Sequence, residues 1–351
     1  MLHNIDGTNN GDEESQVPCF FIFGDSLVDN GNNNQIETII KVNNKPYGID
    51  FPGGISTGRF SNGRNVVDII GEVLGFKDFI PSFATANQGN ATLMTRGVNY
   101  GSGGSGIRND TGKIVGTLLN LEVQLDHHLI TVSKIKSILG NETEAHLNKC
   151  IYFVAVGGSD YLTNYFMPDV QSTSRDYTPQ QFSRVLIEEY KNQIMRLYNN
   201  GARKIALNGV GALGCTPFAI SSLAKRKGCT CSEKVNEAVQ FFNHELILLV
   251  EHLNIDYPKA KFIYLNYFGI GSSDPIIKEM KVLDKSCCPL NGLGLCNTAS
   301  SPCPDRKAYL FWDAFHLTEA ASELIVKRYY NSLLQSDSYP IDLKRLAELK
   351  L

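Results

Sequence analysis

The amino-acid sequence predicts an α/β protein whose mainly parallel sheet is covered by helices on both faces. Five short, almost continuous apolar runs are bounded by Gly, Asn or Asp, which is typical of parallel strands buried on both faces. Helical patterns separate most of these runs, and such alternation indicates βαβ units. The expected strands are residues 18–24, 97–101, 151–156, 204–210 and 260–264.

The expected helices each begin at a residue whose side chain can cap the first turn. They run from Asn62 to about Leu74, from Thr178 to a stop at Gly201, from Ser232 to about Leu253 and from Thr318 to about Leu334. No repeat and no linker is visible. We therefore expect a polar tail over residues 1–16 and a single domain over residues 17–351.

Composition and charge exclude several classes of protein. The 351 residues are 42% hydrophobic and 20% charged, enough apolar material for a large core. Lys and Arg number 33 against 36 Asp and Glu, so no basic excess favours binding to nucleic acid. The longest purely aliphatic run is Leu246 to Val250, far short of the roughly 20 apolar residues that span a bilayer. We expect no integral membrane segment.

Nine cysteines suggest disulfide bonds, and seven of them follow residue 210. Their spacing lacks the paired ligands of a structural zinc site, so no metal is expected. The nearest closure joins Cys215 to Cys229 or Cys231. The odd count leaves at least one thiol unpaired, and Cys19 and Cys150, which open apolar runs, are expected to be buried free thiols.

Three N-x-[ST] triplets, at Asn90, Asn109 and Asn141, are candidate glycosylation sites. Together with the cysteines they favour a secreted protein. Residues 1–16 are polar and acidic and contain no apolar signal core, so we expect a mature or trimmed chain. The alternative is a cytosolic protein whose thiols are all reduced.

Ser26 is the candidate nucleophile. The first expected strand ends in Gly24-Asp25-Ser26-Leu27, which puts a hydroxyl at the carboxyl edge of the sheet, where reactive groups gather in such folds. Gly24 permits a tight turn at this point and leaves space for a substrate.

Asp313 and His316 precede the last expected helix and are three residues apart. One turn can therefore hold the carboxylate against one imidazole nitrogen while the other nitrogen faces outward, as a general base requires. His316 must be neutral to accept a proton, so we expect activity to rise between weakly acidic and neutral pH. The other six histidines lack this context.

Two glycine-rich loops follow expected strands and could supply donors to an oxyanion, namely residues 99–106 and Gly157-Gly158-Ser159-Asp160. Gly101-x-Gly103-x-x-Gly106 also matches a dinucleotide fingerprint. However, turn residues rather than a helix follow it, so no nucleotide cofactor is expected. Residues 54–58 match a G-x-S-x-G elbow, but no strand precedes them.

Four blocks together resemble the plant-type GDSL esterase/lipases of the SGNH hydrolase superfamily. They read FIFGDSLVDNGNN at residues 21–33, TGRFSNGR at 57–64, NYGSGGSG at 99–106 and FWDAFHLTEAA at 311–321. The resemblance extends over nearly everything from Pro18 to Leu334.

The resemblance implies a three-layer α/β/α sandwich of the SGNH-hydrolase, flavodoxin-like type, with a mainly parallel sheet of about five strands. It implies Ser26 as nucleophile in a triad with Asp313 and His316, and an oxyanion hole that includes the N–H groups of Ser26 and Gly103. It also implies secretion, disulfides in the C-terminal half and no cofactor. One departure is Ser159, which stands where the family carries the Asn that completes the oxyanion hole.

Three functions are compatible with these residues. The first is a secreted hydrolase that cleaves small-molecule carboxylic esters through an acyl-enzyme on Ser26. The second is an acyltransferase that uses the same triad and passes the acyl group to an alcohol. The third is a binding protein in which Ser159 has weakened catalysis. The sequence fixes neither the acyl nor the alcohol part of the substrate.

Overall fold

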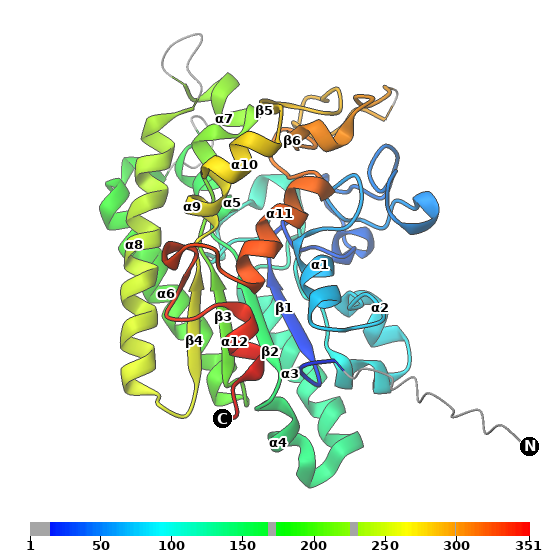
Figure 1. Cartoon of the computed structure of the whole chain (residues 1–351), viewed down its shortest axis with the longest axis vertical. Coiled ribbons are helices and arrows are strands. Elements are labelled where there is room, and N and C mark those ends of the chain that lie inside the picture. The colour runs from blue at the N-terminus through cyan, green and yellow to red at the C-terminus, as the bar shows by residue number, and fades with distance from the viewer. Residues whose placement is uncertain (1–14, 168–172, 225–230, 299) are drawn as a thin grey trace, which may run out of the picture.

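A computed structural model describes residues 15–167, 173–224, 231–298 and 300–351. Its centre is a five-stranded sheet in the order β1-β2-β3-β4-β7 (Figure 1). The first four strands are parallel, and β7 pairs antiparallel with β4 at one edge. The strands are β1 (Phe20–Gly24), β2 (Ile151–Ala155), β3 (Lys204–Asn208), β4 (Lys261–Leu265) and β7 (Ser338–Tyr339).

Helices cover both faces of the sheet, so the fold is the expected three-layer α/β/α sandwich. Alternate strand residues point to opposite faces: Phe20 and Ile22 enter one apolar core, and Phe21 and Phe23 enter the other. The first core is closed by α1 (Val66–Val73), α11 (Glu319–Tyr330) and α12 (Leu343–Glu348). The second is closed by α3 (Leu121–Leu139), α6 (Pro179–Asn199) and α8 (Glu233–Asp256).

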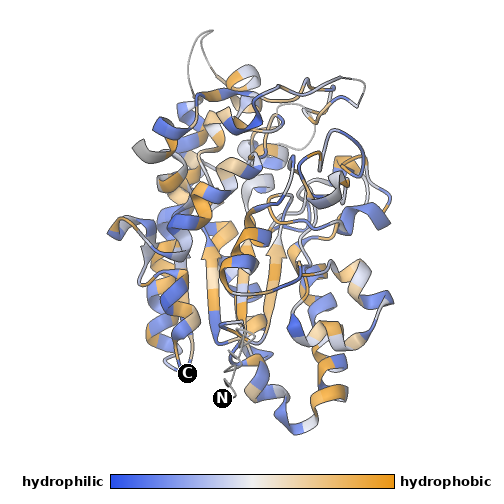
Figure 2. Ribbon diagram, turned by 45° about the vertical axis from the view of Figure 1, so that its right-hand side comes forward, coloured by the Kyte–Doolittle hydropathy of each residue, from blue (hydrophilic) through white to orange (hydrophobic). Residues whose placement is uncertain are grey.

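Figure 2 shows mostly apolar colour on the central strands and alternating apolar and polar colour along the helices around them. The remaining elements are α2 (Phe83–Gln88), α4 (Thr143–Leu147), α5 (Gly158–Asp160), α7 (Pro217–Ser222), α9 (Tyr267–Gly271), α10 (Asp274–Glu279) and a two-stranded sheet of β5 (Val282–Ser286) and β6 (Tyr309–Phe311). None of the described helices is both long enough and apolar enough to cross a bilayer.

Two details of the expected secondary structure are wrong. Residues 97–101 form no strand but only isolated bridges of Asn99 to Ile22 and to Ser82. The Asn99 side chain bonds the backbone of Val28 and Gly101. The fifth strand is instead β7, whose two residues leave no apolar run to detect.

The cap of α1 also differs from the prediction. Asn65, not Asn62, caps this helix, and it forms a reciprocal capping box with Asp68. The side-chain oxygen of Asn62 instead accepts a 2.9 Å hydrogen bond from the N–H of Glu319, at the first turn of α11.

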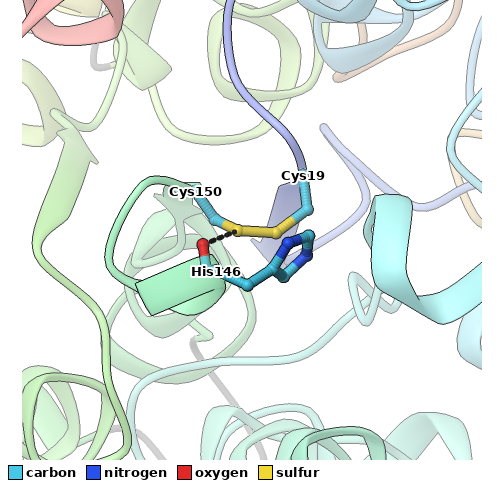
Figure 3. A group of neighbouring side chains, drawn as sticks. All are labelled: Cys19, His146 and Cys150. Atoms are coloured by element: carbon cyan, nitrogen blue, oxygen red, sulfur yellow. Dashed lines mark hydrogen bonds between the residues drawn. A yellow bond between two sulfur atoms is a disulfide. The ribbon is translucent and has the colours of Figure 1, made fainter. Parts of the chain in front are cut away.

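The expectation that Cys19 and Cys150 are free thiols is wrong, because they form a disulfide (Figure 3). Each cysteine directly precedes a strand, and the parallel register pairs Phe20 with Ile151, which brings the two cysteines together. His146 lies beside them (Figure 3). Since both sulfurs are used in the covalent bond, this group offers no thiolate to a metal ion.

The expected disulfides of the C-terminal half are confirmed. Cys215 pairs with Cys231, Cys287 with Cys303, and Cys288 with Cys296. Cys229, the other candidate partner of Cys215, lies outside the described residues, as do residues 1–14 of the expected tail.

Candidate active site

Ser26 lies just beyond the carboxyl end of β1, where the chain turns away from the sheet. Gly24 has a φ of 148°, and a Cβ atom there would lie 2.0 Å from the carbonyl oxygen of Ala155. Only glycine therefore allows β1 to end this close to β2. Ser26 is partly exposed.

Asp313 and His316 lie in the tight loop between β6 and α11. The N–H of Trp312 donates a 2.7 Å hydrogen bond to the carbonyl of His316, which closes the loop. Asp313 Oδ1 accepts hydrogen bonds of 2.9 Å from the N–H groups of Phe315 and His316. Thr318 caps α11 through the N–H of Ala321 and so fixes where the loop ends.

The structure brings the three residues together in one hydrogen-bonded chain. Ser26 Oγ lies 2.7 Å from His316 Nε2, although 290 positions separate the two residues. His316 Nδ1 lies 2.8 Å from Asp313 Oδ1 and 2.9 Å from Oδ2. An ionised carboxylate only accepts, so Nδ1 carries the proton and Nε2 is left to accept the Ser26 proton.

Two aromatic residues that were not predicted from the sequence contact these hydrogen-bonded residues. The Phe60 ring centroid lies 4.8 Å from that of His316. The Tyr47 hydroxyl donates a 2.8 Å hydrogen bond to Asp313 Oδ2. Phe60 falls in the TGRFSNGR block, which was a usable signal, whereas Tyr47 lies in a loop with no motif of its own.

Gly103, the expected second donor to the oxyanion, has its N–H engaged within the protein. It donates a 3.0 Å hydrogen bond to Oδ2 of Asp29, whose Oδ1 also accepts from the N–H groups of Gly31 and Asn32. Burial raises the pKa of Asp29 to about 6, and these N–H donors act in the opposite direction.

Ser159, the residue in the place of the family Asn, lies in α5 at the carboxyl end of β2. It is partly buried, and its carbonyl accepts a 2.8 Å hydrogen bond from the Thr163 hydroxyl. Its own hydroxyl bonds no residue in the described part of the chain. Ser159 therefore has a hydroxyl donor that no residue of the described chain uses.

Two further buried carboxyl groups hold the loops around the site. Asp160 accepts from the N–H groups of Ile107 and Arg108 at 2.9 and 3.1 Å, and from the Thr111 hydroxyl. Asp25 accepts a 3.0 Å hydrogen bond from the Leu27 N–H. Burial raises the pKa of each carboxyl to about 6. The positive form of His316 counteracts this for Asp25, so the two groups are electrostatically linked.

The three candidate glycosylation residues, Asn90, Asn109 and Asn141, are all exposed. Nothing in the described fold therefore blocks access to them.

The chain is similar to known proteins along most of its length. A family model described as GDSL-like lipase/acylhydrolase matches residues 20–329. The chain is 47% identical to the GDSL esterase/lipase At1g29670 of Arabidopsis thaliana, over 96% of this chain and 93% of the relative. It is 45% identical to the GDSL esterase/lipase At1g29660 of the same plant, with the same shares covered.

The family match spans most of the chain, and both relatives align along nearly their whole length. The chain therefore belongs to the GDSL-like lipase/acylhydrolase family and is a hydrolase of the esterase/lipase type.

Proposed function

We propose that the protein is a secreted carboxylic ester hydrolase in which Ser26 attacks the ester carbonyl and forms an acyl-enzyme. The observation that carries the proposal is the unbroken chain of hydrogen bonds from Ser26 Oγ through His316 to Asp313. This arrangement is the one that general-base activation of a serine requires.

The residues divide the reaction between them. His316 Nε2 takes the proton from Ser26 Oγ as the new C–O bond forms, and it then protonates the departing alcohol. Asp313 keeps Nδ1 protonated and stabilises the imidazolium that forms in between. In the second half, His316 takes a proton from water, which attacks the acyl-enzyme and releases the acid.

The tetrahedral intermediate needs donors to its oxyanion, and we assign three. The Ser26 N–H forms no hydrogen bond with a described residue and is ready to donate. The Gly103 N–H now donates to Asp29 and would have to donate to the oxyanion instead. The Ser159 hydroxyl, which bonds no described residue, supplies the third in the place of the family amide.

Secretion is supported by four disulfides in the described part of the chain, which persist in oxidising compartments. The exposure of Asn90, Asn109 and Asn141 is consistent with glycosylation there.

Ser26→Ala tests the proposal. The variant should lose at least about 1000-fold in kcat on short-chain p-nitrophenyl esters, and a fluorophosphonate probe should label Ser26 in the native protein only. Ser137→Ala, a change at an exposed serine of α3, serves as the control and should behave as the native protein does. Full activity of Ser26→Ala would refute the assignment, and an unlabelled native protein would instead favour a binding role.

Acyl transfer to an alcohol is the second candidate, favoured by the altered position at Ser159. Transfer and hydrolysis share the acyl-enzyme and differ only in which hydroxyl attacks it. Product analysis with a panel of added alcohols separates them: ester products would support transfer, and free acid alone would exclude it for that panel.

A further inference from the structure

The carboxylate of Asp313 is tied to the rest of the protein through one side chain, that of Tyr47. Asp313 is completely buried. Three of the donors to it come from its own loop: the N–H groups of Phe315 and His316, and the His316 imidazole. The Tyr47 hydroxyl, 2.8 Å from Oδ2, is the fourth and the only one from elsewhere in the described chain.

The direction of this hydrogen bond is fixed. The N–H of Cys296 donates to the Tyr47 oxygen at 3.0 Å, and an N–H group can only donate. The phenolic proton is therefore left for Asp313, whose ionised carboxylate can only accept. Tyr47 thus acts as a donor toward the group that orients His316.

Tyr47 is held by contacts of its ring and by a hydrogen bond to its backbone. Its ring is buried and contacts Trp312 and Phe60 edge to face, with ring centroids 6.4 Å apart in each pair. The Tyr47 carbonyl accepts a 2.7 Å hydrogen bond from the Ser56 hydroxyl, which anchors the backbone. The hydroxyl therefore reaches Asp313 from a rigid support.

The Cys288–Cys296 disulfide completes a closed ring around the site. The N–H of Cys288 donates to the carbonyl of Trp312 at 3.0 Å, next to Asp313, while Cys296 donates to Tyr47. The ring runs from Asp313 to Tyr47, to Cys296, across the disulfide to Cys288 and back through Trp312. Tyr47 and Asp313 are thus joined a second time, through Cys296, the disulfide, Cys288 and Trp312.

We propose that Tyr47 is a positioning residue for the reaction, which holds the Asp313 carboxylate in the orientation that keeps His316 aligned with Ser26. The inference rests on the proposed function of Ser26. Donation from the phenol spreads the negative charge of Asp313 over one more hydrogen bond, so the carboxylate stabilises the imidazolium less than a bare one would. Tyr47 thus affects both the alignment of His316 and the strength with which Asp313 stabilises the imidazolium.

Tyr47→Phe removes the hydroxyl and keeps the ring. We expect kcat to fall about tenfold or more, while KM changes little. This is less than the roughly 10⁴-fold loss that follows when a triad carboxylate no longer orients its histidine. The acidic limb of the kcat/KM profile should move toward neutral pH, because the less neutralised carboxylate favours the imidazolium. Tyr329→Phe is the matched control, since it removes another buried hydroxyl, the one that bonds Asn208 at the far end of α11, and it should not move the limb.

Replacement of Tyr47 by 3-fluorotyrosine strengthens the hydrogen bond to Asp313 instead of removing it. The more acidic phenol is a stronger donor, so the acidic limb should move to lower pH. Asp25 also faces His316, and burial raises its pKa to about 6, but it is unaltered in both variants and contributes equally to each profile.

The inference is supported if the acidic limb of the kcat/KM profile moves in opposite directions in the two Tyr47 variants. The inference is overturned if this acidic limb stays at the native position in both variants or moves in the same direction in both. If Ser26→Ala retains activity, the proposed function fails instead, so the two failures are distinguishable.

Discussion

The N–H of Gly103 donates a 3.0 Å hydrogen bond to Oδ2 of Asp29, which ties the glycine-rich loop to the segment that follows β1. Asp29 is fully buried and gathers the N–H groups of Gly31 and Asn32 as well. The resting enzyme therefore keeps this donor satisfied, and an oxyanion has to compete with a buried carboxylate for it.

Gly103 also has no room for a side chain, which leads to the first prediction. A Cβ atom there would lie 2.5 Å from the Phe60 ring, which packs against His316. Gly103→Ala keeps the N–H but should push Phe60 into His316. We expect a fall in kcat of about tenfold or more on p-nitrophenyl esters.

A second change tests whether packing is the cause. Phe60→Leu creates space, so the Gly103→Ala/Phe60→Leu double variant should recover part of the activity lost by Gly103→Ala alone. Losses that simply add in the double variant would mean that the two residues act independently.

The second prediction concerns the Cys19–Cys150 disulfide. It closes a loop across 131 positions, whereas Cys215–Cys231 closes one across 16. In the chain-entropy account, removing the longer link should cost about 2 kcal/mol more than removing the shorter one. Urea denaturation of Cys19→Ala/Cys150→Ala and Cys215→Ala/Cys231→Ala measures the difference in the free energy of unfolding.

Activity provides the control for this pair. Cys19 precedes β1 and Ser26 follows it, so the link lies at the opposite end of the strand from the site. Cys19→Ala/Cys150→Ala should therefore keep kcat near the native value below its unfolding transition. A loss of kcat equal to that expected for Ser26→Ala would contradict this.

The third prediction is that stability is greatest at weakly acidic pH. Burial raises the pKa of Asp25, Asp29 and Asp160 from 3.8 to about 6. The folded state therefore binds more protons than the unfolded chain between about pH 4 and 6, and the free energy of unfolding falls as pH rises through this window. Hydrogen bonds from Arg306 lower the pKa of Asp50, so its contribution is lost only below about pH 4.

Calorimetry from pH 4 to 8 measures this dependence. Asp25→Asn removes one buried charge and should raise the melting temperature at pH 7.5, with a gain in unfolding free energy on the order of 1–3 kcal/mol. Asp284→Asn, at an exposed carboxyl, is the control and should leave the slope unchanged. A melting temperature that increases steadily from pH 4 to 8 would contradict the prediction.

The sequence predicted the sheet well where strands are long and apolar, as in β1 to β4, because burial on both faces leaves a continuous pattern. At residues 97–101 the apolar pattern is present but no strand forms, because the pattern does not contain the bonds of the Asn99 side chain to the backbone of Val28 and Gly101. Strand β7 was missed because its two residues are too few to leave a pattern. The Cys19–Cys150 bond was missed because it depends on the register between two strands, which a local pattern does not contain.

In the site too, residues with a local sequence pattern were predicted and contacts made only by folding were not. Ser26 was found from its position after a strand, and Asp313 and His316 from their spacing within one turn. Tyr47 could not be found in this way, since its contact with Asp313 joins positions 266 residues apart and follows from the packing of a loop. The engagement of Gly103 with Asp29 likewise appears only once the two loops are folded together.

The last prediction concerns Ser159. Loss of one donor to an oxyanion typically costs about 100- to 1000-fold in kcat, and a serine hydroxyl replaces the family amide here. Because this hydroxyl bonds no described residue, it is available to an oxyanion or to a water that bridges to one. Ser159→Ala should therefore lower kcat by about tenfold or more if the hydroxyl donates, and leave it unchanged if it does not.

Ser159→Asn makes the complementary change by restoring an amide with two donor hydrogens. It should raise kcat on simple esters, because an amide offers two donor hydrogens on a longer stem to the oxyanion. Thr163→Ala is a matched control in the same segment, since it removes only the hydroxyl that donates to the Ser159 carbonyl. If Ser159→Asn folds normally and leaves hydrolysis unchanged or lower, a missing amide does not limit this enzyme, and the residue at position 159 selects the substrate or the acceptor instead.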